Sequence, residues 1–147
     1  MASFAGKDAC VTSDSKPDST LLTKQKEYDQ YIRKHGYLDF DDLLLEVIEL
    51  LKEDSSVLHT ITRRYQWIFV DEYQDINPAQ HKLLQLITNE NTHVTAIGDP
   101  NQAIYGFRGS DVKFFAQFGE DFPGAAVMQL EENYRSGANI ISASGQV

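Results

Sequence analysis

The chain has 147 residues, of which 41% are hydrophobic and 24% are charged, and these proportions indicate a folded domain with its own core. Its net charge of −9 argues against a free-standing nucleic-acid-binding protein, because such proteins usually present a basic face to the phosphates. Residues 1–20 lack the apolar run expected of a signal peptide, and no segment approaches the roughly 18 apolar residues of a membrane span. Its single cysteine, Cys10, excludes an intrachain disulfide, and we expect a reducing, cytoplasmic setting.

The first part of the chain predicts a tail followed by three helices. Residues 1–20 are small and polar without apolar periodicity, so they predict a flexible tail. Residues 22–35 predict a helix that stops at Gly36, and Ser55 is expected to cap a short helix that reaches Tyr65. Between these two helices, Asp39 can cap a helix whose apolar residues form one stripe: Phe40, Leu43, Leu44, Val47, Ile48 and Leu51.

From Trp67 onward the pattern alternates between strands and helices. Buried strands are expected at residues 67–70, 93–97 and 125–130. Helices are expected from Asn77-Pro78 to about Thr88, from Ser110 or Asp111 through three phenylalanines, and from near Gly137. This order predicts an α/β fold with a parallel sheet flanked by helices, and it places the ends of all three strands at one edge.

Polar clusters follow each predicted strand. The first is Asp71-Glu72-Tyr73-Gln74-Asp75, whose paired acids are well sited to hold a magnesium ion and to activate a water beside a phosphate. Solvated acids at a strand end are the simpler alternative. From Gln66 onward there are only 4 basic residues against 10 acidic ones, and two of the four, Arg108 and Arg135, lie in the other clusters.

The second cluster runs from Gly98 to Ser110 and contains an amide, two aromatic residues and an arginine between turn residues. Aromatic side chains beside arginine can stack on bases and hold a phosphate backbone, although an ordinary glycine-rich loop would share much of this composition. In the third cluster, Leu130 to Ser136, Tyr134 could stack on a nucleobase and Arg135 could stabilise charge on a phosphate. By themselves these two residues would more often form a surface pair.

Taken in order, the clusters resemble the motifs of UvrD/Rep-type superfamily 1 DNA helicases. Residues 71–75 resemble the Walker B motif, residues 98–109 the third motif, and residues 130–136 the fourth. Leu38-Asp39-Phe40-Asp41-Asp42-Leu43-Leu44 is similar to the helix that precedes Walker B in this family. The resemblance spans about Tyr28 to Ser144 and implies a fragment of a RecA-like P-loop NTPase core.

The resemblance implies a role for each matched residue. Asp71 would hold magnesium, Glu72 would act as general base, and Gln74 and Asp75 would link hydrolysis to neighbouring motifs. Gln102 and Arg135 would contact the γ-phosphate of ATP, and Tyr134 would stack on adenine. The residues facing single-stranded DNA would be Tyr105, Phe107 and Arg108, with phenylalanine at 107 where the family commonly has tryptophan. The family couples ATP hydrolysis to translocation and duplex unwinding, usually 3′ to 5′, in replication, repair or recombination.

The P-loop motif of the family is missing from these residues, and so are the motifs that follow the fourth. No Gly-x-x-x-x-Gly-Lys-Ser/Thr occurs, and Gly6-Lys7 does not supply one because Asp8 follows it and no strand precedes it. We therefore expect the middle of a helicase: a helical segment at 21–66, part of the ATPase domain at 67–136, and the start of a further domain at 137–147. Such a fragment is expected to be inactive without the P-loop half.

Two other functions remain open, and the missing P-loop strand has a consequence for the stability of the chain. The chain could be a non-catalytic remnant or interaction module that retains the helicase sheet. It could also be a magnesium-dependent phosphoryl-transfer or receiver-like domain using Asp71, Glu72 and Asp99, which would explain neither of the other clusters. Because a strand carrying the P-loop is absent, an exposed sheet edge predicts self-association or marginal stability.

Overall fold

The computed structural model describes residues 19–146, apart from the side chain of Arg108. Most of the tail predicted for residues 1–20, Cys10 included, lies outside the described residues, while Ser19 and Thr20 belong to helix α1 (Ser19–Lys34). The chain leaves α1 through Gly36, whose positive φ of 71° suits glycine at the end of a helix. None of the helices within residues 19–146 is long and apolar enough to cross a membrane.

Helix α2 (Phe40–Glu53) begins as predicted at Asp39. The Asp39 carboxylate accepts the backbone N–H of Asp42 at 2.8 Å, and the Asp42 carboxylate accepts the backbone N–H of Asp39 at 3.3 Å. This capping box fixes the first turn. The predicted apolar stripe is only partly covered, because Ile48 and Leu51 are buried against the rest of the domain while Phe40 is 92% exposed.

Helix α3 (Ser55–Arg64) corrects the predicted cap by one residue. Asp54, not Ser55, is the N-cap, and its carboxylate accepts the backbone N–H groups of Ser56 and Val57 at 2.8 and 3.2 Å. A carboxylate and a hydroxyl are both good caps, so adjacent Asp and Ser residues cannot be ranked by type alone.

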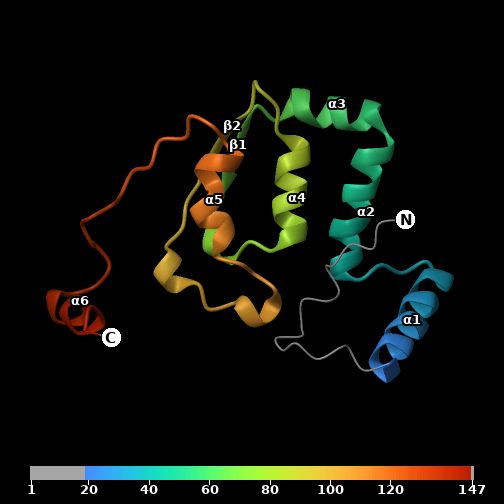
Figure 1. Ribbon diagram of the computed structural model, residues 1–147, viewed down its shortest axis with the longest axis horizontal. Helices are drawn as coiled ribbons and strands as arrows, with labels where there is room; N and C mark the ends of the chain where they lie inside the picture. Colours follow the sequence, from blue (N-terminus) through green and yellow to red (C-terminus); the bar gives the residue numbers. More distant parts are fainter. Residues whose placement is uncertain (1–18, 147) are drawn as a thin grey trace.

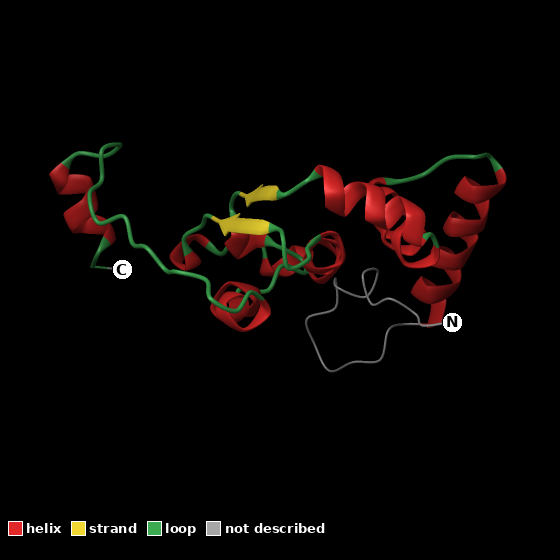
Figure 2. Cartoon of the chain, turned by 90° about the horizontal axis from the view of Figure 1, so that it is seen from above, coloured by secondary structure: helices red, strands yellow, loops and turns green. Residues whose placement is uncertain are grey.

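The sheet consists of two parallel strands, β1 (Trp67–Val70) and β2 (His93–Ala96), with Trp67 opposite His93. Helix α4 (Pro78–Ile87) connects them, capped by Asn77 as the Asn77-Pro78 pair predicts. Helix α5 (Lys113–Asp121) follows β2, and both helices lie on the same face of the sheet (Figures 1 and 2). The core is formed by Tyr73, Ile76, Leu84 and Phe114, with Ile68, Val70, Val94 and Ala96 of the strands packed against it.

The opposite face of the sheet is open, which corrects the prediction of strands buried on both faces. Trp67 and Phe69 alternate with the core-facing residues of β1 and are 63% and 67% exposed. An alternating pattern of inward and outward residues is what covering one face produces. The sequence does not reveal this alternation, because both the core-facing and the exposed residues of β1 are apolar.

The predicted third strand at residues 125–130 does not form. These residues have no strand conformation, the described sheet ends with β1 and β2, and Val127 and Leu130 are 88% and 96% exposed. A strand requires a neighbour to satisfy its backbone groups, and Figure 1 shows this segment leading away from the sheet to helix α6 (Ala138–Ser144). The fold is therefore mixed α/β with a small two-stranded parallel sheet.

Candidate functional site

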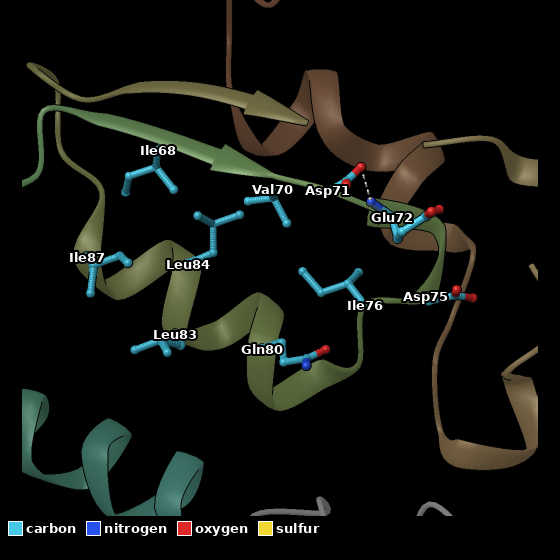
Figure 3. A pocket seen from close by; sticks show the side chains of 10 residues that line it. All are labelled: Ile68, Val70, Asp71, Glu72, Asp75, Ile76, Gln80, Leu83, Leu84 and Ile87. Carbon is cyan, nitrogen blue, oxygen red and sulfur yellow. Dashed lines mark hydrogen bonds between the residues drawn. The ribbon is translucent and has the colours of Figure 1, made fainter. Parts of the chain in front are cut away.

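The polar cluster after β1 begins with a strained turn. Glu72 has φ 50° and ψ 43°, the left-handed conformation, and is the non-glycine residue with positive φ in the described chain. This conformation costs roughly 1–2 kcal/mol for a residue with a Cβ. The Asp71 carboxylate accepts the backbone N–H of Glu72 at 3.0 Å and supports the turn. Both acidic side chains are exposed beyond the end of the strand (Figure 3).

Tyr73 anchors this turn to the core. Its backbone N–H donates to the carbonyl of Ile97 at 2.9 Å, and its ring meets Phe118 edge-on with ring centroids 5.3 Å apart. The side chain is fully buried, and its hydroxyl has no hydrogen-bond partner among the described residues. Burial, followed by the charge of Asp121, raises the pKa of Tyr73 to about 12. The tyrosine therefore stays neutral and holds the acidic turn in place.

Gln74 connects the ends of the two strands. Its side chain is 2% exposed, its Nε2 donates to Glu72 Oε2 at 2.7 Å, and its Oε1 accepts the backbone N–H of Asp99 at 3.1 Å. Only this orientation of the amide places a donor against the carboxylate and an acceptor against the N–H group. The polar residues after β1 and after β2 thus form one connected site.

A groove of about 430 Å³ lies between β1 and α4, next to the acidic turn (Figure 3). Asp71, Glu72, Asp75 and Gln80 provide its polar part, and apolar side chains cover the rest: Ile68, Val70, Ile76, Leu83, Leu84 and Ile87. One carboxylate oxygen of Asp75, Oδ1, is buried without a hydrogen-bond partner among the described residues. Gln80 was not foreseen as part of the site, because its sequence signal is only that of a capping partner for Asn77.

The carboxylates suit a magnesium ion whose remaining ligands are waters and a phosphate. Within residues 19–146, histidine, cysteine and acidic side chains form no group of three or more that could enclose a metal. Magnesium is commonly held by one or two carboxylates, with waters and substrate phosphates as the remaining ligands. Asp71 and Glu72 offer such exposed, acceptor-only oxygens at a strand end.

The residues after β2 continue the site. The Asp99 carboxylate accepts the side-chain amide of Gln102 at 2.8 Å and the backbone N–H of Asn101 at 3.0 Å. These hydrogen bonds, that from Gln102 first, lower the pKa of Asp99. Further along, the rings of Tyr105 and Phe107 lie 6.0 Å apart and are 38% and 62% exposed. The side chain of Arg108, the third residue predicted to face DNA, lies outside the described part of the chain.

The third cluster does not join the other two, which corrects the expectation of a common edge. Tyr134 and Arg135 are exposed on the segment that leads away from the sheet (Figure 1). The cluster has local order of its own, because Asn133 Oδ1 accepts the backbone N–H groups of Arg135 and Ser136, both at 2.9 Å. The Tyr134 hydroxyl donates to the Glu132 carboxylate, and this hydrogen bond raises the pKa of Tyr134. Without the third strand, nothing draws these residues toward Asp71.

A family model and individual relatives of this chain point to the same protein family. The family model of the UvrD/REP helicase N-terminal domain matches residues 5–123. The ATP-dependent DNA helicase PcrA of Staphylococcus epidermidis is 37% identical over 141 residues, which are 96% of this chain and 19% of that protein. PcrA of Staphylococcus aureus is 38% identical over 127 residues, 86% of this chain and 17% of that protein. The chain thus spans about a fifth of the length of the curated relatives it matches.

The matched range contains both strands, the acidic turn and the loop after β2, so the connected site lies within the family's domain. The chain belongs to the UvrD/REP helicase family.

Proposed function

We propose that this chain is the part of an ATP-dependent DNA helicase that carries the Walker B acids and the loop coupled to them. The observation that supports this most directly is the connected site, in which Gln74 joins the acidic turn after β1 to Asp99 after β2. Hydrolysis of ATP would drive translocation along single-stranded DNA in the cytoplasm. The direction would be 3′ to 5′, which is usual in this helicase family.

In this function the chain's own residues divide the work. Asp71 would hold the magnesium ion of the nucleotide, which would neutralise phosphate charge. Glu72 would accept the proton of the attacking water. Gln102, whose amide donates to the Asp99 carboxylate, would face the γ-phosphate. Gln74 connects these groups through its hydrogen bonds to Glu72 and Asp99, and Asp75 would link them to neighbouring motifs. Each role follows from the position of the residue in a family motif.

Two further residues act only if their segment changes place. Tyr134 would stack on adenine and Arg135 would reach the γ-phosphate, yet both lie exposed on the segment between α5 and α6. We infer that residues 125–136 come to the edge of the sheet in the complete helicase, where 137–147 begin a further domain. An additional strand between β2 and residues 125–136 would supply backbone hydrogen-bond partners to β2 on one side and to this segment on the other.

The exposed pair Tyr105 and Phe107 would stack on DNA bases, with Arg108 contacting the phosphate backbone. Stacking on aromatic rings tolerates any base sequence, as a translocating enzyme requires. The chain has a net charge of −9, so these few residues would not hold DNA by themselves. The rest of the helicase would supply the basic surfaces that contact the phosphates.

A second candidate has one observation in its favour. No phosphate-cradling Gly-x-x-x-x-Gly-Lys-Ser/Thr occurs in the 147 residues, so a non-catalytic interaction module that retains the helicase sheet would have the same sequence features. The neighbouring genomic sequence discriminates between them. A P-loop half encoded beside or in frame with this chain favours the helicase, and its absence favours the module.

Binding of Mg-ATP tests the proposal. We expect the 147-residue chain alone to show no saturation by isothermal titration calorimetry below about 1 mM, which corresponds to about −4 kcal/mol. A chimera in which this chain replaces the matching segment of Staphylococcus epidermidis PcrA, and therefore regains a P-loop, should bind Mg-ATP and hydrolyse it when single-stranded DNA is added. Micromolar binding by the chain alone would show that it holds phosphates by other means.

A further inference from the structure

Gly98 occupies a position where a side chain has almost no room. A Cβ placed on Gly98 would lie 2.4 Å from Gln74 Oε1, 3.0 Å from the ring of Phe115 and 3.1 Å from the backbone nitrogen of Tyr73. Its backbone requires no glycine, since the residues with positive φ are others. The restriction at Gly98 is therefore one of space, and its closest neighbour is the side-chain amide that connects the two strands.

The three neighbours differ in how easily they can move. Phe115 packs against the core, and the Tyr73 nitrogen is held by its hydrogen bond to Ile97. Gln74 Oε1 is the far end of a side chain with several rotatable bonds. A methyl group at position 98 would therefore displace the Gln74 amide before it displaced the sheet or the core.

We propose that Gly98 is a positioning residue for hydrolysis: by lacking a side chain, it lets Gln74 hold the Glu72 carboxylate and the Asp99 backbone together. This inference rests on the proposed function, in which Glu72 is the general base. The Gln74 hydrogen bond directs the Glu72 carboxylate from a backbone in the left-handed conformation. Displacing the amide frees that carboxylate and leaves the Asp99 N–H without its acceptor.

The same connection reaches the residue proposed to face the γ-phosphate. Asp99 accepts the amide of Gln102 through its carboxylate, while its backbone N–H is held by Gln74. The path from Glu72 to Gln102 therefore passes through one buried amide, and Gly98 determines whether that amide fits. We infer that a change at the loop after β2 alters the orientation of the base after β1 through this amide.

Hydrogen exchange on the 147-residue chain, followed by NMR, tests the connection without any nucleotide. Gly98→Ala should speed exchange of the Asp99 amide about tenfold, the ratio expected for loss of one hydrogen bond. Gln74→Ala should do the same, and Gly98→Ala/Gln74→Ala should match Gln74→Ala alone, because the effect of the first change passes through Gln74. The amides of β1 and β2 should keep their protection. Gly106→Ala is the control, since a Cβ there has nothing within 4 Å.

Three results would overturn the proposal: unchanged Asp99 exchange in Gly98→Ala, equal loss of protection throughout the sheet, or simple additivity of the two substitutions. In the chimeric helicase, Gly98→Ala should lower kcat about tenfold with KM changed less than about twofold, because positioning of the base acts on the chemical step. The failure of the proposed function has a different outcome. If Glu72→Gln left ATP hydrolysis intact while Gly98→Ala still released the Asp99 amide, the connection would stand and the role of Glu72 would be wrong.

Discussion

Replacing Tyr73 by phenylalanine removes a hydroxyl that is fully buried and has no hydrogen-bond partner among the described residues. Burying an unpaired polar group costs about 1–3 kcal/mol, and phenylalanine keeps the ring contacts with Phe115 and Phe118. We therefore expect Tyr73→Phe to increase the free energy of unfolding by about 1–3 kcal/mol near neutral pH. Most core substitutions destabilise, so an increase would be a demanding result.

The effect should grow at alkaline pH. Burial, followed by the charge of Asp121, raises the pKa of Tyr73 from 10.0 to about 12. Because the folded pKa lies above the unfolded value, the native chain retains more protons in this window and the wild-type chain loses stability as the pH rises from 10 toward 12. Two pKa units correspond to roughly 2–3 kcal/mol. The phenylalanine variant lacks this loss, so the difference between the two proteins should widen.

Urea denaturation at about pH 7 and about pH 11 measures both effects. Tyr37→Phe is the matched control, because Tyr37 is 63% exposed and its substitution should change stability little at either pH. A Tyr73→Phe chain that is less stable than wild type near neutral pH would show that the hydroxyl has a partner. An equal difference at both pH values would refute the pKa argument.

Two further substitutions test the helix cap and the DNA-facing aromatics. Asn77→Ala should cost about 0.5–2 kcal/mol in urea denaturation, because it removes the 2.8 Å bond from the Gln80 N–H to the cap, whereas Asn77→Asp should keep most of the stability; equal losses would contradict the capping role. In the chimeric helicase, Phe107→Ala should weaken single-stranded DNA binding by about 1–3 kcal/mol and Phe107→Trp should not, as measured by fluorescence anisotropy. Phe40→Ala, on exposed α2, is the control, and unchanged binding by Phe107→Ala would remove Phe107 from the DNA surface.

Local signals in the sequence predicted most elements of the fold. The caps at Asp39 and Asn77, the apolar residues of β1 and the spacing between strands are properties of neighbouring residues, and the structure confirms them. The prediction of a third strand was wrong for a physical reason. Residues 125–130 have a strand-like composition, yet a strand forms only beside a partner, and composition does not reveal whether a partner is present.

The site was predictable in its residues more than in its connections. The acids after β1 and the polar loop after β2 were expected at one edge of the sheet, because parallel strands end together. The left-handed conformation of Glu72 and the contact of Gly98 with Gln74 have no local signal. The contact of Gly98 with Gln74 depends on residues far apart in the sequence that the sheet brings together, as the Gln74–Asp99 hydrogen bond illustrates. Self-association through the open sheet edge stays a prediction, which size-exclusion chromatography can check.

The central claim is that Glu72 acts as the base for ATP hydrolysis once this chain is joined to a P-loop. The most direct test is the rate of ATP hydrolysis, stimulated by single-stranded DNA, of the chimeric helicase with Glu72 and with Glu72→Gln. A general base contributes about 10²–10⁴-fold, so the variant should lose at least about 100-fold in kcat while its affinity for Mg-ATP is retained. Equal rates, or a chimera with Glu72 that binds Mg-ATP and DNA without hydrolysis, would contradict the account.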